Sequence, residues 1–376
     1  MNDFNLTITS YNENPWEQRQ LESITQKLGT GKSKFTKFTK DSLHIFPILG
    51  STSIIGYDDS YDYNGNFILT ARVGINAGEL YVYKGKVKIS DNTIYIQSKK
   101  TSFLFPALQY NNVKKISFGT GQRLIKSSEL KKFKICVPSS KEQDKIGKIF
   151  KIIEKIIALY ERKTRLLGKL RTFLTQRLFS NSSKVSLYFD NKNWSKHKIS
   201  EFLTERNEKV VPNSSIPLVS FTVEKGVTPK SKRYNREFLV KDDNKKYKIT
   251  KKDDIVYNPA NLKFGAIARN KFGNAAFSPI YVTFITKLNP AFTEFLVCRK
   301  DFINLALKYQ EGTVYERMAV KSKDFLNLKI YLPNSSRDIN HIAQILQSLD
   351  TLVSLNKNKV SLITLIKKEL LNTMFI

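Results

Sequence analysis

The sequence predicts an α+β protein in which two mostly-β globules alternate with two long α-helices, and three observations indicate this order. Two short apolar strands end at Pro138 and at Pro333, and each is followed by a polar turn. After each turn, apolar side chains recur in heptad spacing over about 35 residues, the pattern of a long helix packed lengthwise against a partner. The two halves repeat at the offset that separates Ile146 from Ile342, so we expect an internal pseudo-two-fold repeat.

The first globule is expected to span residues 1–138. Aromatic and β-branched runs at 67–70, 79–83 and 93–96 are separated by Gly, Asn and Pro, which is typical of short strands. The second globule is expected at 185–333, after a Ser-rich linker at 181–184, and its residues 280–285 form a similar run. Trp16 and Trp194 each precede an apolar residue by five positions, which marks where each half of the repeat begins.

The two long helices are predicted at 139–180 and 334–376. Ser139 and Glu142 have the spacing of a capping box, and Ser335 with Asp338 is a weaker version. Helices of this length need a partner along their whole extent, because isolated surface helices are far shorter. The apolar seam residues are Ile146, Ile149, Ile153, Ile156, Tyr160, Leu167, Leu170 and Leu174 in the first helix, and Ile342, Ile345, Leu349, Leu352, Ile363, Ile366 and Leu370 in the second.

The charge of the chain points to a polyanionic partner. It has 63 Lys and Arg against 33 Asp and Glu, a formal net charge of +30, with 41% hydrophobic residues that suffice to form folded cores. Both globules share the excess. Such a surplus favours nucleic acid, because neutralising phosphates releases counterions. A generally Lys-rich composition without a polyanion remains the alternative.

Several classes of protein are excluded or disfavoured. Cys136 and Cys298 lie far apart without a CxxC motif, and three scattered His cannot form a Cys/His metal cluster, so neither a disulfide scaffold nor a zinc site is expected. No run of 18 apolar residues occurs, and the first ten residues lack the features of a signal peptide. We therefore expect a cytoplasmic protein.

Three motifs suggest enzyme chemistry but are incomplete. The segment 29–33 ends like a phosphate-binding loop, yet Gln26 stands where the first Gly is required. Asn258 and Pro259 begin a tetrad like that of adenine methyltransferases, but Ala260 and Asn261 replace its second Pro and its aromatic residue. The Asp pairs at 58–59 and 253–254 lack the companion residues of a nuclease site and are better explained as solvated turns.

Polar loops in both globules are better candidates for DNA contacts. The loop 119–123 combines two glycines with Gln122 and Arg123, side chains that read adenine and guanine edges, and 312–317 occupies the matching place in the second globule. The segment 230–234 combines basic residues with an aromatic one, as phosphate tracking requires. A structural turn and a solvated charge run are the respective alternatives.

Together these residues resemble the specificity (S) subunits of type I restriction-modification systems, over essentially the whole chain. The motifs that carry the likeness are WEQR at 16–19, FPILGS at 46–51, ARVG at 71–74, NAG at 76–78 and GTGQ at 119–122 in the first globule, and PLVS at 217–220, KKDDIVYNP at 251–259 and GAIA at 265–268 in the second. Arg123 departs from many relatives, which have Pro or a small residue there. Arg337 and Asp338 replace the usual Glu-Gln pair after Pro333.

The resemblance implies that each globule is a target recognition domain that reads one half of an asymmetric, split sequence in double-stranded DNA. It implies further that the long helices pair as an antiparallel coiled coil and that the seam residues above also dock two methyltransferase (M) subunits. In the family those subunits bind S-adenosylmethionine and methylate adenine, while a restriction (R) subunit uses ATP and Mg²⁺ to cut DNA. The chain itself is then expected to bind no cofactor or metal and to have no catalytic residue.

The candidate DNA-binding residues combine the polar loops with nearby basic and aromatic side chains. They are Lys32, Arg72, Asn76, Gln122, Arg123 and Lys126 in the first globule, and Lys232, Arg233, Tyr234, Lys263, Tyr315, Arg317 and Lys321 in the second. Two other functions stay open at this point. One is a solitary or fused DNA adenine methyltransferase, and the other is a repressor-like DNA-binding protein without enzyme partners.

Overall fold

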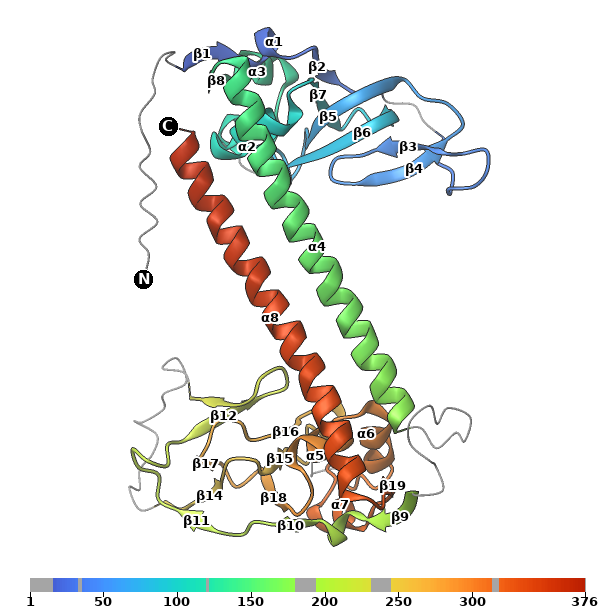
Figure 1. Cartoon of the computed structure of the whole chain (residues 1–376), viewed down its shortest axis with the longest axis vertical. Helices are drawn as coiled ribbons and strands as arrows, with labels where there is room; N and C mark the ends of the chain where they lie inside the picture. The colour runs from blue at the N-terminus through green and yellow to red at the C-terminus, as the bar shows by residue number, and fades with distance from the viewer. Residues whose placement is uncertain are drawn as a thin grey trace. The chain divides into compact units, whose positions relative to one another are not determined.

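A computed structural model describes residues 16–32, 36–119, 122–179, 194–230, 245–312 and 318–375 (Figure 1). The chain divides into two compact units, one formed by residues 1–162 and 357–376 and the other by residues 163–356. Each long helix contributes residues to both units. The units are described separately below.

The first unit is built on a six-stranded sheet. Its elements are β1 (Glu17–Gln20), α1 (Leu21–Ile24), β2 (Lys27–Thr30), β3 (Phe46–Leu49), β4 (Ile54–Asp58), β5 (Tyr63–Ala71), β6 (Leu80–Ile89), β7 (Thr93–Gln97), α2 (Thr101–Tyr110), η1 (Val113–Ile116), α3 (Ser127–Lys132) and β8 (Lys134–Val137). The strand order is β2-β7-β5-β6-β3-β4. All neighbours are antiparallel except β3 and β6, which are parallel.

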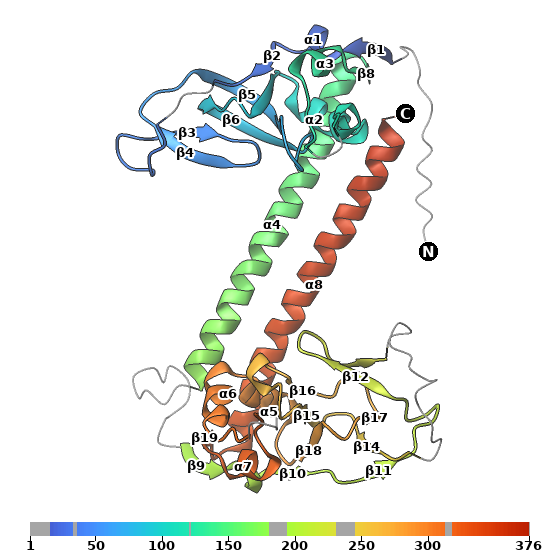
Figure 2. The same ribbon diagram turned by 180° about the vertical axis from the view of Figure 1, so that it is seen from behind.

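The alternation of side chains along the central strands gives this sheet two apolar faces. Ile68 on β5 points to the face that is covered by α2, and it packs in one buried cluster with Phe103 and Leu108 of that helix. Phe67 and Leu69 point to the opposite face and form a second buried cluster. Figure 2 shows α2 beside β5 and β6 from behind, in agreement with Figure 1.

The second unit divides its strands among smaller sheets. Its elements are β9 (Trp194–Lys198), η3 (Ile199–Glu201), β10 (Leu203–Glu205), β11 (Lys209–Val210), β12 (Val219–Thr222), β13 (Gly226–Pro229), β14 (Tyr247–Thr250), β15 (Ile255–Tyr257), η6 (Leu262–Phe264), β16 (Ile267–Arg269), β17 (Ala275–Phe277), β18 (Val282–Thr286), α5 (Pro290–Val297), α6 (Lys300–Leu307), α7 (Ser322–Asn327) and β19 (Lys329–Pro333). The largest sheet has the order β10-β18-β15-β16. Tyr257, Phe284 and Phe325 stack at its centre, with ring centroids 4.9 to 5.7 Å apart.

The repeat expected from the sequence is present in the strands that flank each globule. β1, just after Trp16, pairs antiparallel with β8, and β9, which begins at Trp194, pairs antiparallel with β19. Each pair leads directly into a long helix, α4 (Ser140–Leu178) or α8 (Ser336–Met374). The hydroxyls of Ser139 and Ser335 each accept a long, 3.4 Å hydrogen bond from the backbone three residues later, so both caps form.

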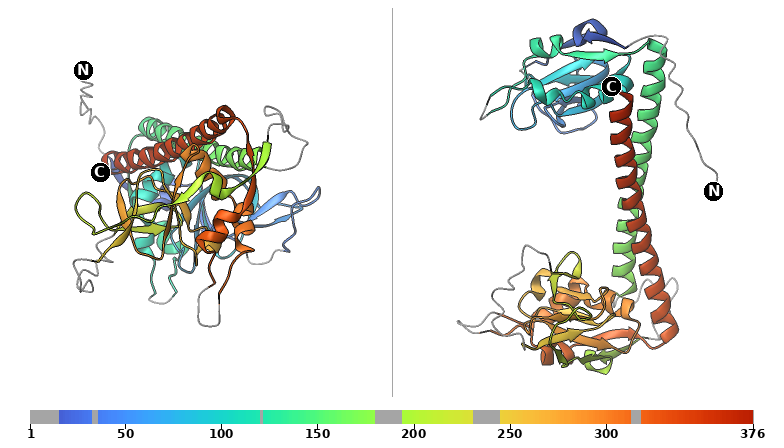
Figure 3. Two further views of the ribbon diagram at one scale, coloured as in Figure 1. Left: turned by 90° about the horizontal axis from the view of Figure 1, so that it is seen from below. Right: turned by 90° about the vertical axis from the view of Figure 1, so that its left-hand side faces the viewer.

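The two long helices run antiparallel within each unit. In the first unit, Glu154 of α4 forms an ion pair with Lys367 of α8, and Lys359 lies 5.4 Å from the ring centroid of Tyr160. Residue numbers that rise along α4 thus meet numbers that fall along α8, and Figure 3 shows the two ribbons side by side there. In the second unit, Arg171 of α4 pairs with Asp350 of α8. The predicted α+β fold with paired long helices is confirmed.

Each long helix ends with a phenylalanine buried in a core. Phe179, directly after α4, packs against Phe292 in the second unit at a centroid distance of 5.4 Å. Phe375, directly after α8, is 2% exposed and contacts Trp16, Phe103 and Phe150 in the first unit. The two residues are separated by the same offset as Ile146 and Ile342, so the repeat includes this contact.

Candidate nucleic-acid interface

Two polar loops of the first unit lie against each other. The backbone N–H of Gly74 donates to the carbonyl of Arg123 at 2.9 Å, and the N–H of Ile125 donates to the carbonyl of Arg72 at 2.8 Å. The loop after β5 and the loop before α3 are therefore held as one surface, which we call the recognition-loop cluster and define as residues 71–79, 89–93, 118–119 and 122–126. These backbone hydrogen bonds fix the positions of the Cα atoms, so the side chains of the cluster project from a defined surface.

Five of the six candidates in the first globule belong to this cluster. Gln122, Arg123 and Lys126 are exposed, whereas Arg72 and Asn76 are half-buried. Residues 120 and 121 lie outside the described part of the chain. The hairpin is closed by two backbone hydrogen bonds between Phe118 and Leu124, at 2.9 and 3.1 Å.

Gly119 has a specific reason to be glycine. Its φ is +102°, and a Cβ atom there would lie 2.7 Å from the carbonyl oxygen of Gln122. Only glycine adopts this backbone without strain, so the position requires it. Lys126 lies 5.1 Å from the ring centroid of Phe118, a cation–π contact that holds its ammonium beside the hairpin.

Lys32, the sixth candidate, reaches the same cluster through the turn between β6 and β7. Its backbone N–H donates to the carbonyl of Ile89 at 2.8 Å, and the N–H of Arg72 donates to the carbonyl of Asn92 at 2.9 Å. The Lys32 ammonium is exposed and lies 3.2 Å from a carboxylate oxygen of Asp62. An exposed pair of this kind is weak, so a phosphate could replace the carboxylate.

The second unit repeats the hairpin. Glu311 and Ala319 exchange two backbone hydrogen bonds, as Phe118 and Leu124 do in the first unit. The N–H of Val320 then donates to the carbonyl of Pro259 at 3.2 Å, which ties this hairpin to the turn after β15. Val320 and Leu124 are separated by the same number of residues as Ile342 and Ile146, so they are equivalent positions of the repeat.

Only two of the seven candidates in the second globule can be placed. Lys263 is exposed on η6, 5.0 Å from the ring centroid of Phe264, and Lys321 is exposed, 3.0 Å from a carboxylate oxygen of Glu311. The others lie outside the described residues: Lys232, Arg233, Tyr234, Tyr315 and Arg317.

The motifs that suggested enzyme chemistry have structural roles. The side-chain oxygen of Asn258 accepts hydrogen bonds from the backbone of Ala260 and Asn261, at 3.1 and 3.2 Å, so it closes a turn. Asp254 is buried and accepts two hydrogen bonds from Arg206, at 2.8 and 3.0 Å. A Cβ atom on Gly31 would lie 2.1 Å from the carbonyl oxygen of Ile89, so this glycine permits a close backbone crossing.

Three lysines on β6 form a row that was not among the candidates expected from the sequence. Lys84, Lys86 and Lys88 occupy alternate positions, so their side chains start from one face of the strand. Lys86 lies 4.8 Å from the ring centroid of Tyr61, and Lys88 forms a 2.7 Å ion pair with Asp58. Their alternating spacing was the available signal.

The Asp58 carboxyl is held ionised by its surroundings. Burial raises its pKa, but the hydrogen bond from the Lys88 ammonium, with a further one from the backbone N–H of Ser60, outweighs the burial, and the pKa is about 2. This pair joins β4 to β6 at the edge of the six-stranded sheet.

The seam residues fall into two groups. Those buried or half-buried are Ile146, Ile153, Ile156, Tyr160, Leu167 and Leu174 on α4, and Ile342, Leu349, Ile363 and Leu370 on α8; those exposed are Ile149, Leu170, Ile345, Leu352 and Ile366. Phe150, four residues after Ile146, and Leu346, four residues after Ile342, are buried instead. The predicted seam is thus partly turned outward.

A second apolar row lies on the outer side of α4. Ile152, Leu159, Leu166 and Phe173 are spaced by seven residues and are 48%, 64%, 54% and 51% exposed. On α8, Leu355 and Leu362 have the same spacing and similar exposure. Rows of large exposed apolar side chains at heptad positions mark a helix face that can bind another helix.

The described residues contain neither a candidate metal site nor a candidate membrane-spanning helix. No cluster of His, Cys, Asp and Glu suited to a metal ion occurs among them. Within the same ranges, no helix combines the length and the apolar character needed to cross a bilayer.

Comparison with known proteins agrees with this geometry. Residues 13–167 match the sequence model of the type I restriction modification DNA specificity domain. A Mycoplasma pneumoniae protein that carries the name of a type I specificity subunit is 22% identical over 151 residues, which are 38% of this chain and 49% of the relative. The chain thus matches this curated relative over about half of the relative's length.

The likeness in fold extends over nearly the whole chain. The crystal structure of a type I restriction-modification system S subunit from M. genitalium superposes with a TM-score of 0.69 at 16% sequence identity, covering 97% of this chain and 98% of the other. This likeness establishes the fold of the chain. Residues 13–167 thus match the type I restriction modification DNA specificity domain in sequence, and the chain as a whole has the fold of a type I S subunit. The resemblance expected from the sequence is confirmed, by the sequence match over residues 13–167 and by the fold over nearly the whole chain.

Proposed function

We propose that the chain is the sequence-reading subunit of a type I restriction-modification complex and has no catalytic activity of its own. Each unit reads one half of a split, asymmetric DNA target through its hairpin and the adjoining turn. The recognition domains correspond to residues 1–138 and 185–333. The observation that carries this proposal is the repeated hairpin, tied at Leu124 and at Val320 to the turn beside it.

The recognition-loop cluster supplies the chemistry that reading requires. Gln122 and Arg123 can each form two hydrogen bonds to a base edge in the major groove, while Lys32 and Lys126 can neutralise phosphates. The hydrogen-bonded backbone beneath them limits the conformational entropy lost on binding. Base reading and backbone contact are thus combined on one rigid surface.

The long helices position the partner enzymes. The outer apolar row of α4, with Ile152 and Leu159, and the exposed seam residues of both helices supply the face on which two methyltransferase subunits dock. S-adenosylmethionine binds to those partners, and ATP with Mg²⁺ to a restriction subunit where one is present. The complex acts on chromosomal DNA in the cytoplasm.

A domain exchange tests this proposal. The chain is coexpressed with its methyltransferase partner, residues 1–138 are replaced by another recognition domain of the family, and methylated adenines are mapped across the host genome. One half of the methylated motif should change and the other should stay. If both halves change, the two units are not independent readers.

Activity of the purified chain alone provides the matching control. Incubated with S-adenosylmethionine, or with ATP and Mg²⁺, it should neither methylate nor cleave a duplex that contains the target. Turnover without a partner would instead establish a solitary methyltransferase or nuclease. If no methyltransferase copurifies with the chain from its host, the result would favour a repressor-like DNA-binding protein.

A further inference from the structure

We propose that a groove in the first unit docks an acidic peptide segment of a partner protein. The groove has a volume of about 820 Å³ and is formed by β6, α2 and the adjoining parts of α4 and α8. Its middle is apolar, with Leu80, Val82, Phe105 and Pro106 among its lining residues. Val82 is 54% exposed although it lies on a central strand. An apolar floor open to solvent is typical of a binding surface.

Lysines flank this apolar middle. Lys84, Lys99 and Lys151 line the groove and are exposed, and among the described residues none of the three forms an ion pair with a carboxylate. Lys367 differs, because its ammonium already pairs with Glu154 and donates to the side-chain oxygen of Gln109 at 3.3 Å.

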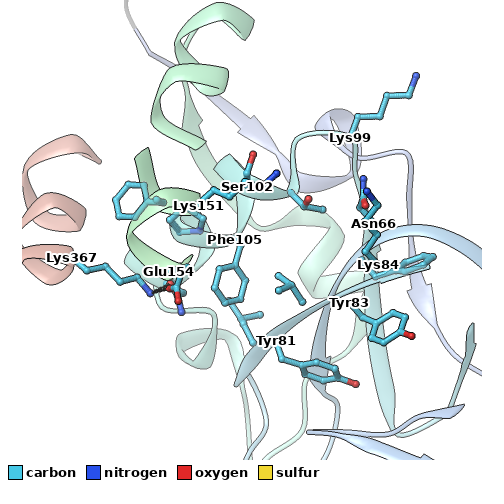
Figure 4. A pocket seen from close by; sticks show the side chains of 17 residues that line it. Asn66, Tyr81, Tyr83, Lys84, Lys99, Ser102, Phe105, Lys151, Glu154 and Lys367 are labelled. Atoms are coloured by element: carbon cyan, nitrogen blue, oxygen red, sulfur yellow. Dashed lines mark hydrogen bonds and ion pairs between the residues drawn. The ribbon is translucent and has the colours of Figure 1, made fainter. Parts of the chain in front are cut away.

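The lysines stand at both ends of the groove. Figure 4 shows Lys84 and Lys99 at one end, Lys151 beside Glu154 and Lys367 at the other, and Phe105 between them. The groove therefore offers positive charge, apolar surface and positive charge in succession along its length. Its ligand should present the complementary order.

An extended peptide with an apolar residue between carboxylates has this order. A DNA backbone presents a row of phosphates with no apolar group to cover Val82 and Phe105, so it would leave the floor exposed. A mononucleotide concentrates its negative charge at one end, which would leave the lysines at the other end unpaired. Buried apolar anchors give affinity and flanking charges give orientation, as in other peptide grooves.

This site is separate from the proposed DNA contacts. None of the candidate DNA-binding residues lines the groove, and Lys84 is the one member of the β6 lysine row that does. The inference therefore goes beyond the proposed function, and either can fail without the other.

The test uses the full-length chain and a fluorescein-labelled peptide of ten residues, with Leu-Phe between two Glu pairs and Gly-Ser ends. Fluorescence anisotropy should show saturable binding. The double change Lys84→Glu and Lys99→Glu should weaken it about tenfold or more, because like charges then meet at one end of the groove. Val82→Glu should weaken it as well, whereas Val82→Thr should have a small effect.

A matched control and a DNA arm make the result decisive. Lys132→Glu with Lys134→Glu makes the same change of charge at two exposed residues outside the groove and should leave peptide binding unchanged. A peptide with Gln in place of every Glu should bind poorly. The absence of saturable binding would overturn the proposal. So would equal binding of the Gln peptide, or a loss confined to duplex DNA in the lysine variants, which would assign the groove to DNA.

Discussion

Gln122 and Arg123 are exposed at a hairpin whose backbone is fixed by Gly119 and by hydrogen bonds to the loop after β5. Their side chains suit base edges, whereas Lys126 beside Phe118 suits a phosphate. At this scale, specificity and affinity should depend on different residues of the same cluster.

Alanine variants separate the two effects. Gln122→Ala or Arg123→Ala should cost roughly 1–3 kcal/mol on the cognate duplex and little on unrelated DNA, because a base contact is lost. Lys126→Ala should weaken both and reduce the slope of log K against log salt by about one. Anisotropy titrations at several salt concentrations measure this. An equal loss on both duplexes for Gln122→Ala would place that residue at the DNA backbone.

Asp58 makes the stability of the first unit depend on acidity. Its pKa of about 2 lies below the ordinary 3.8, so the ion pair with Lys88 stabilises the fold above about pH 4 and loses this effect as the pH falls toward 2. Asp58→Asn should cost about 1 kcal/mol at neutral pH, and the difference from wild type should shrink in acid. Urea unfolding at pH 6 and pH 3 measures this. A difference that stays constant would show that the carboxylate charge is not responsible.

At the scale of elements, the helices divide their apolar residues between two tasks. Phe150 and Leu346 are buried inside the units, while Ile152, Leu159 and Leu166 remain exposed at heptad spacing on α4. The inner row explains how the helices pair, and the outer row has no contact of comparable burial within the described chain. A partner helix would remove this apolar surface from water.

Charged substitutions on the outer row should release the partner without unfolding the chain. Leu159→Glu with Leu166→Glu should abolish copurification of the methyltransferase subunit, because burying two carboxylates in an apolar interface is costly. The helical circular dichroism and the unfolding midpoint should stay close to wild type. Lys155→Glu with Lys169→Glu serves as the control at exposed polar positions of the same helix. Retention of the partner by the leucine variant would place docking elsewhere.

For the whole molecule, the two helices are expected to set the distance between the two half-sites. Seven residues added after Arg162 and seven after Asn356 keep the heptad pattern and lengthen each helix by about 10 Å, equivalent to about three base pairs. Three base pairs also turn the duplex by roughly 100°, so affinity should fall unless DNA or protein twists to compensate. Sites selected from a library with randomised spacers measure the preferred length. Full affinity at the parental spacing would show that the helices do not set it.

The sequence predicts elements well where a local pattern is strong. The heptad pattern recurs along each long helix, and one strand that leads into a proline stands before each of them, at Pro138 and at Pro333. The structure contains these strands and helices. The sequence predicts the buried face of the helices less well. Ile149 and Ile345 match the heptad but are exposed, because which of two adjacent apolar rows faces inward depends on the residues of the opposite helix.

The order of globules and helices, the basic charge and the candidate reading loops follow from the sequence alone, since each depends on residues close together in the chain. Contacts between distant segments were decided only by the tertiary structure. The backbone bonds that join Arg72 to Ile125, the burial of Phe179 and Phe375, and the lysine-flanked groove beside Phe105 bring together residues far apart in sequence. Local patterns fix which face of an element is apolar, whereas packing in three dimensions fixes what that face meets.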